Sequence, residues 1–281
     1  MNSHKKASLI MLLLLIHLIF ISKIIVMFIA VIFPSIAEPE NSTFLQMIGS
    51  TVYFVIPLLI YMAVKKLPIN KVLMLKPISL KNFFIIIFLS LVMQPLLQFI
   101  NILTTTFNEN ELAPVLNMYL ESSFWKLFLA VAVFPAVLEE VVFRGIFVKE
   151  YEDMPFWFGA IFSGIFFGIM HLTITQLFYA AVAGVIMAAL VKVTGSIWAG
   201  ILSHFVLNGT QITMAYFSKK IIPDEVYEES LNLVNQSTIL EKIYLIAGSM
   251  MYLAFSLPFL ATAIYLFVKV NREKIAIIKQ E

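Results

Sequence analysis

Three short motifs place ionisable side chains inside stretches of sequence that are otherwise strongly apolar. They read EEVVFR at 139–144, FGIMH at 167–171 and HFVLN at 204–208. A charged side chain at the centre of a bilayer costs on the order of 2.5–3.5 kcal/mol on insertion scales, so such groups usually pair with one another or carry function. Two carboxylates, an arginine, two imidazoles and an amide are suited to activating a water molecule and stabilising an oxyanion.

Helical spacing gives the two adjacent glutamates different partners. Residues four apart share one face of a helix, so Glu140 can pair with Arg144. Glu139 is rotated by about 100° around the helix and has no partner of this kind. We therefore predict a structural ion pair between Glu140 and Arg144, and we predict that Glu139 acts as a general base or acid.

The residue types also exclude several mechanisms. The chain has no cysteine, which excludes a thiolate nucleophile, a disulfide framework and a Cys-ligated metal. The only aspartates, Asp153 and Asp224, lie in predicted loops, so an intramembrane aspartyl dyad is excluded. No HExxH or GxSxG motif is present. A divalent metal such as zinc, bound by Glu139, His171 and His204, stays open, because two histidines and a glutamate form a known catalytic zinc set.

The whole chain has the composition of a polytopic membrane protein. Of its 281 residues 61% are hydrophobic and only 13% are charged, which excludes an ordinary soluble domain. Apolar stretches of about 17–25 residues predict about eight transmembrane helices in a single all-α membrane domain covering 1–281. The predicted spans are 9–33, 44–64, 82–105, 122–149, 155–172, 174–192, 195–217 and 240–268.

The basic residues predict that both termini are cytoplasmic. Most of the 19 lysines and arginines fall in segments that are then on the inside, while the loops at 106–121 and 218–239, predicted external, are acidic. A cleaved signal peptide ending near Ala37 is disfavoured, because the apolar run is too long and contains Lys23. The basic residues on the predicted inside are Lys5, Lys6, Lys65, Lys66, Lys71, Lys76, Lys81, Lys149, Lys192, Lys269, Arg272, Lys274 and Lys279.

The predicted helices bring the three motifs to similar depths. Pro155 lies in a charged turn and is 16 residues from both Glu139 and His171. Two antiparallel helices leaving that turn would therefore place these two residues level with each other. The motif at 204–208 would lie shallower by roughly 5–10 Å, at a rise of about 1.5 Å per residue.

In this order the motifs EExxxR, FxxxH and HxxxN resemble the signature of the CPBP family, the CAAX-protease and bacteriocin-processing membrane proteins also called Abi. The resemblance covers roughly residues 120–212, which would be the catalytic core. It implies an intramembrane endopeptidase in which Glu139 and His171 hold and activate the attacking water. His204 and Asn208 would stabilise the oxyanion. Three further residues would support the site: Glu140, Arg144 and Phe167.

The same resemblance bears on the metal and on the substrate. If Glu139 were a metal ligand, only Glu140 would remain as general base, so we favour a metal-free glutamate mechanism over zinc. The Lys-, Ile- and Asn-rich composition suggests the plasma membrane of an AT-rich bacterium, where prenylated CAAX tails are not expected. Peptide maturation, pheromone processing and bacteriocin self-immunity are then the expected roles.

The expected partners are membrane lipid and a peptide or protein substrate, with no nucleic acid. The alternative function is non-enzymatic: an immunity, scaffold or transport protein on the same fold, since intramembrane Glu, Arg and His also mark ion pathways. No internal repeat relates the two halves of the chain, which argues against transport.

Overall fold

The computed structural model describes residues 12–13, 16–66, 68–108, 112–223, 225–227, 229 and 237–278, and every element within these ranges is helical. Lys5, Lys6, Asp224 and Lys279, together with the start of the first predicted span, lie outside the described residues. The α-helices are α2 (Ser22–Ile32), α3 (Ser42–Lys65), α4 (Ile69–Val72), α5 (Leu80–Val92), α6 (Gln94–Phe107), α7 (Leu112–Leu120), α8 (Phe124–Phe128), α9 (Phe134–Glu140), α10 (Val148–Glu150), α11 (Phe156–Ile169), α12 (Ile174–Thr194), α13 (Ile197–Ile221), α15 (Ile239–Val270) and α16 (Arg272–Ile278).

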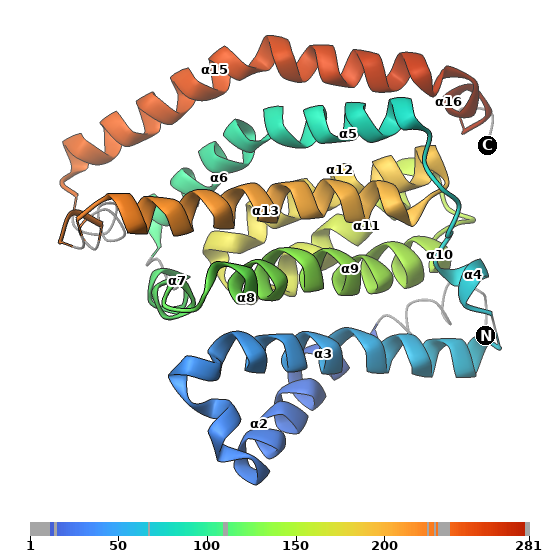
Figure 1. Cartoon of the computed structure of the whole chain (residues 1–281). Coiled ribbons are helices and arrows are strands. Elements are labelled where there is room, and N and C mark those ends of the chain that lie inside the picture. Colours follow the sequence, from blue (N-terminus) through green and yellow to red (C-terminus); the bar gives the residue numbers. More distant parts are fainter. Residues whose placement is uncertain are drawn as a thin grey trace.

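Short π- and 3-10-helical elements complete the described part. The π-helical elements are η1 (His17–Ile21), η4 (Leu129–Val133) and η5 (Val141–Phe147), and the 3-10 turns are η2 (Pro34–Ala37) and η3 (Pro39–Asn41). The long helices lie side by side in one bundle (Figure 1). Helix α15 covers one side, against α5 and α6, and α3 covers the opposite side, against α9 and η5. Helices α11, α12 and α13 lie between them.

The eight predicted spans are confirmed in part. Each predicted segment coincides with a helical stretch, and four described helices are long and apolar enough to cross a membrane. The shorter apolar helices, Ile19–Ile32 and Phe156–Ile169, fall below that length. The helical run at 124–150 contains the charged residues of the first motif, which lower its apolar character. The four long apolar helices are Ser42–Lys65, Leu80–Phe107, Ile174–Thr194 and Ile239–Val270.

The described segments that are predicted to be cytoplasmic lie at one end of the bundle. Where α3 and α10 end, Lys65 Nζ lies 2.6 Å from Glu150 Oε1. On α16, Lys274 Nζ donates to the carbonyl of Thr194 at the end of α12 (2.7 Å). We call this the lysine-rich end. Contacts at the opposite end join α13 to the turn after α7, and α15 to α6: Lys219–Glu121 (2.5 Å) and Lys242–Thr106 O (3.2 Å).

Small residues let α11 and α12 approach closely. A Cβ on Gly164 would lie 2.5 Å from the backbone nitrogen of Val185, and one on Gly168 would lie 2.4 Å from the carbonyl oxygen of Leu177. Both distances are too short for a methyl group, so only glycine fits at these two positions. Small residues at helix interfaces are the usual means of close packing in membranes. The close contact fixes the turn between the two helices, which carries His171.

The helical run from α8 to α10 changes register ahead of the first motif. The backbone N–H of Phe134 bonds to the carbonyl of Leu129, five residues back, as in a π-helix. The next residue is Pro135, which has no N–H and cannot donate the α-helical bond to the carbonyl of Val131. Such π-helical segments in α-helices often occur at functional sites. Here the register change leaves the Val131 carbonyl available to a side chain.

Candidate active site

The ion pair predicted in the first motif is present and fully buried. Arg144 Nη1 lies 2.6 Å from Glu140 Oε1, and neither side chain has exposed surface. Arg144 Nη2 also donates to the carbonyl of Gly184 on α12 (3.0 Å), and the guanidinium lies 4.7 Å from the ring centre of Phe167. Removing one partner of such a pair leaves a buried charge uncompensated, at a cost of about 3–5 kcal/mol. The bond from Arg144 to the Gly184 carbonyl therefore holds η5 against α12.

The same carboxylate orients His204. His204 Nδ1 lies 3.1 Å from Glu140 Oε1, and because a carboxylate accepts hydrogen bonds, Nδ1 carries the imidazole proton. The other ring nitrogen, Nε2, is then an acceptor, and the Asn208 amide nitrogen lies 3.1 Å from it. The same amide donates to the carbonyl of Val131 (3.1 Å), which fixes which end of the amide faces His204. Both N–H groups of Asn208 are therefore engaged.

His171 lies just beyond the end of its helix. The predicted span continued to residue 172, but α11 ends at Ile169 and Leu172 has a left-handed backbone (φ 59°), so the chain turns there into α12. The prediction that His171 lies within the helix is therefore wrong by two residues. Its Nδ1 lies 2.8 Å from the carbonyl of Phe167 and donates to it. The second nitrogen, Nε2, is thereby left as an acceptor.

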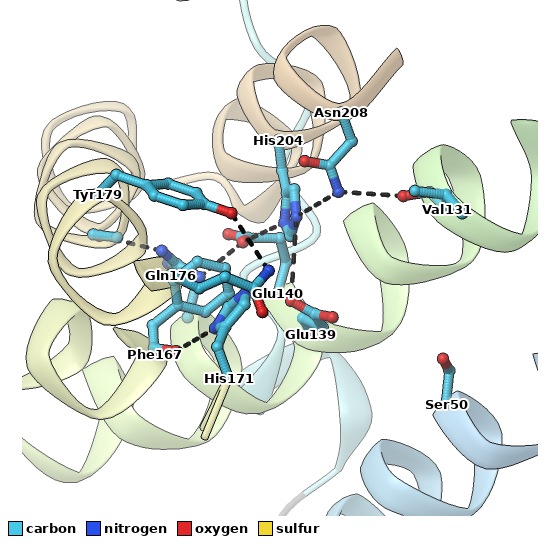
Figure 2. Close-up of polar contacts among 12 residues, drawn as sticks. Ser50, Val131, Glu139, Glu140, Phe167, His171, Gln176, Tyr179, His204 and Asn208 are labelled. Carbon is cyan, nitrogen blue, oxygen red and sulfur yellow. Dashed lines mark hydrogen bonds and ion pairs between the residues drawn. The ribbon is translucent and has the colours of Figure 1, made fainter. Parts of the chain in front are cut away.

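Glu139 is the carboxylate of the pair that makes no hydrogen bond among the described residues. Its side chain keeps 17% of its surface exposed, and its closest cationic or imidazole contact is His204 Nε2, at 3.9 Å from Oε2. Within the described ranges it makes no hydrogen bond, so both oxygens can accept from water or substrate. Figure 2 shows Glu139 next to Glu140 and facing the histidine side chains. The predicted pairing of Glu140 with Arg144 is therefore confirmed, and the role of Glu139 as a general base stays a prediction.

All four predicted catalytic side chains line one cavity of about 440 Å³. Glu139 reaches it from α9, His171 from the turn after α11, and His204 and Asn208 from α13. The cavity extends past Val131 toward α7 and the beginning of α3, which is the end opposite the lysine-rich end. Most of its other lining residues are apolar: Leu97, Val115, Leu116, Ala180, Ala183, Met187, Leu207, Ile212 and Ala215.

The arrangement of these side chains does not fit a metal site. Among the residues described, no three His, Asp or Glu side chains are placed to hold a metal ion. Zinc needs ligand atoms at about 2.0–2.2 Å with free lone pairs. The Nε2 of His204 already accepts a hydrogen bond from Asn208, and Glu139 Oε2 lies 3.9 Å from it. We therefore derive no step through a metal ion.

Two polar residues of the cavity, Gln176 and Tyr179, were not predicted from the sequence. Both lie on α12 and follow Thr173 at intervals of three residues, so the three share one helical face. That spacing could have predicted a polar face on this helix, because polar residues repeated on one face of an apolar helix indicate a polar environment. The two side chains are bonded to each other, with Gln176 Nε2 donating to Tyr179 Oη (3.2 Å).

Comparisons with known proteins agree with the motifs. Residues 121–210 match the family model described as type II CAAX prenyl endopeptidase Rce1-like. A curated relative from Bacillus subtilis (strain 168), named "Putative membrane peptidase YdiL", is 34% identical over 79 residues. That alignment covers 28% of this chain and 32% of the relative, so the chain matches about a third of the relative's length. A search of solved structures finds no match.

Proposed function

We propose that this chain, whose residues 121–210 match the Rce1-like CAAX prenyl endopeptidase model, is an intramembrane endopeptidase of the CAAX-protease (CPBP) family that hydrolyses a peptide bond of a membrane-associated peptide or protein. The observation that supports the proposal best is the carboxylate of Glu139, which makes no hydrogen bond among the described residues and shares a cavity of about 440 Å³ with His171 and His204. A carboxylate that accepts no hydrogen bond is costly in an apolar environment, and general base catalysis is a reason to retain it.

In the proposed reaction, a water molecule lies between Glu139 and the Nε2 of His171. Glu139 takes one proton from the water, and His171, held by its bond to the Phe167 carbonyl, accepts a hydrogen bond from the other. The water oxygen attacks the carbonyl carbon of the scissile bond and forms a tetrahedral oxyanion. Glu139 then passes the proton to the leaving nitrogen, the C–N bond breaks, and an acid and an amine are released.

His204 and Asn208 form the opposite wall of the proposed site. By resemblance they stabilise the oxyanion, for which preorganised N–H donors are the usual means. In the resting geometry the two N–H groups of Asn208 serve His204 and the Val131 carbonyl. The N–H given to His204 would therefore have to turn toward the substrate. Because Glu140 keeps His204 in the Nδ1–H form, His204 has no N–H for the oxyanion, and the donor of the pair is Asn208, which His204 helps to hold in place.

The cavity also suggests a class of substrate. Its lining is mostly apolar outside the site itself, and among the described lining residues the only acidic or basic side chains are Glu139 and the two histidines. We propose that it accepts an extended, apolar stretch of peptide rather than a charged one. In a bacterial plasma membrane, such an enzyme would serve peptide maturation, pheromone processing or immunity to a bacteriocin.

The test uses the full chain purified in detergent and a pool of synthetic peptides of mixed, mainly apolar sequence. Mass spectrometry of the products should reveal cleavage by the wild type and none by Glu139→Gln, measured at equal concentration and equal folded fraction. A wild type that cleaves no more than Glu139→Gln does would contradict the proposed function and favour the non-enzymatic alternative.

A further inference from the structure

The four motif residues of the proposed site offer several hydrogen-bond acceptors and no free donor. Glu139, the Nε2 of His171 and the Nε2 of His204 all accept, and both N–H groups of Asn208 are engaged. The reaction, however, turns a carbonyl oxygen into an oxyanion, which must receive hydrogen bonds as its charge develops. The cavity should therefore contain a further donor.

A chain of hydrogen bonds on α12 orients one hydroxyl group that can serve as this donor. The Thr173 hydroxyl donates to Gln176 Oε1 (3.1 Å), so the amide oxygen of Gln176 faces Thr173 and its amide nitrogen faces the other way. That nitrogen donates to Tyr179 Oη (3.2 Å). The phenol oxygen is therefore the acceptor in this bond, and its own proton points elsewhere. In the described part of the chain, no acceptor for that proton lies within hydrogen-bond distance.

The hydroxyl of Tyr179 is placed in the same cavity as the four motif residues. Figure 2 shows the phenol directed from α12 toward the side chains of His204 and Gln176. The other tyrosine of the cavity, Tyr119 on α7, differs in this respect, because its hydroxyl donates to Gln46 Oε1 (3.2 Å). Of the two, Tyr179 alone keeps its proton available.

We propose that Tyr179 is a further catalytic residue, whose hydroxyl donates a hydrogen bond to the scissile carbonyl oxygen and to the oxyanion formed from it. The proton stays on the phenol throughout, so the reaction is otherwise unchanged. Gln176 is a positioning residue: it occupies one lone pair of the phenol oxygen and thereby turns the proton toward the substrate. This inference rests on the proposed endopeptidase function.

The central variant is Tyr179→Phe, which removes one oxygen atom and keeps the ring. The substrate is a fluorogenic peptide made from the sequence that the wild type cleaves best in the synthetic pool. Loss of one oxyanion donor lowers kcat by about 10²–10³-fold in known enzymes. We expect a fall in kcat of roughly 100-fold with KM and Tm close to wild type. The matched control is Tyr61→Phe, which removes a hydroxyl bonded to Glu150 Oε1 (2.6 Å) outside the cavity and should leave kcat within about threefold of wild type.

A second variant separates positioning from packing. Gln176→Met keeps the length of the side chain but cannot orient the phenol, so kcat should fall by roughly tenfold. Combined with Tyr179→Phe, the change Gln176→Met should cause no further loss of kcat, because the effects of residues that act as one unit are not additive. Additive losses, or losses in Tm and KM rather than in kcat, would assign both residues to packing and overturn the inference.

The two proposals fail in different ways. If the wild type cleaves peptides, Glu139→Gln does not, and Tyr179→Phe turns over at the wild-type rate, the role of Tyr179 is wrong and the proposed function stands. If the wild type and Glu139→Gln are equally inactive on the whole pool, the endopeptidase function is contradicted and the role of Tyr179 is contradicted with it.

Discussion

The imidazole of His204 is oriented by the carboxylate of Glu140, whose Oε1 lies 3.1 Å from His204 Nδ1. That carboxylate also forms the buried ion pair with Arg144. One glutamate therefore performs two structural tasks, and its neighbour in sequence, Glu139, is left free to face the cavity. The division follows from helix geometry, because adjacent residues point about 100° apart.

Glu139→Gln should abolish peptide cleavage without unfolding the protein. The amide is nearly isosteric with the carboxylate but cannot take a proton from water, and Glu139 has no hydrogen bond within the described structure that the change would break. The expected result is turnover below detection with Tm within about 2 °C of wild type. Cleavage near the wild-type rate would show that another group is the general base.

Glu140→Gln should lower both stability and activity. The change leaves Arg144 buried without its counter-charge, at a cost of about 3–5 kcal/mol, and weakens the bond that orients His204. Thermal unfolding in detergent should show a large fall in Tm. The matched control is Glu152→Gln, which breaks an exposed pair with Lys149 and should cost less than about 1 kcal/mol. Equal Tm values for the two variants would contradict the structural role of Glu140.

Local spacing in the sequence was enough to predict part of the site. The i,i+4 relation between Glu140 and Arg144 gave their pairing, and the equal spacing of Glu139 and His171 from Pro155 agrees with their position on a common cavity. These features depend on local helical spacing alone. Four of the eight predicted spans follow similarly from apolar length.

Contacts between helices could not be predicted in the same way. The bond from Asn208 to Val131 depends on how α13 lies against η4, and the bond from His204 to Glu140 depends on the rotation of both helices. Neither the packing of α13 against η4 nor the rotation of the helices can be predicted from a single sequence. The missing N–H of Pro135, four residues after Val131, was visible in the sequence, but its consequence required the packing of a second helix.

Gly200→Ala should destabilise the protein through Glu140. A Cβ at this position would lie 2.3 Å from Glu140 Oε2, an oxygen that is buried and has no hydrogen-bond partner within the described residues. The glutamate cannot move away without breaking its bonds to Arg144 and His204. We expect a clear loss of Tm and of activity.

The control for this change is Gly209→Ala on the same helix. Its Cβ would meet Phe128 at 3.5 Å and Ala132 at 4.0 Å, both ordinary contact distances. Alanine also has a higher helix propensity than glycine by about 1 kcal/mol. This variant should therefore unfold at or above the wild-type temperature. If both variants lost the same stability, the close approach of Gly200 to Glu140 would not be the cause.

Cysteine labelling can test which end of the bundle faces the cytoplasm. The chain contains no cysteine, so single cysteines report without background. Glu152→Cys lies beside Lys149 near the lysine-rich end, and Glu121→Cys lies at the opposite end; the two glutamate side chains are 52% and 71% exposed. By the positive-inside rule, a membrane-impermeant maleimide should label intact cells at position 121 and not at 152. The reverse pattern would invert the predicted topology.

A metal-free mechanism predicts that chelators leave turnover unchanged. Zinc bound by His171, His204 and Glu139 would need three free lone pairs within about 2.2 Å of one point. The lone pair of His204 is occupied by Asn208, and the nearest Glu139 oxygen lies 3.9 Å away. With Glu139 bound to a metal, the other carboxylate beside the site among the described residues would be Glu140, which Arg144 neutralises.

The measurement is elemental analysis of active, purified protein, followed by a chelator titration with re-addition of zinc. We expect substoichiometric metal that does not track activity. One equivalent of zinc that is lost together with activity on chelation, and whose re-addition restores activity, would overturn the metal-free mechanism. In that case Asn208→Ala, which frees the lone pair of His204, should tighten zinc binding.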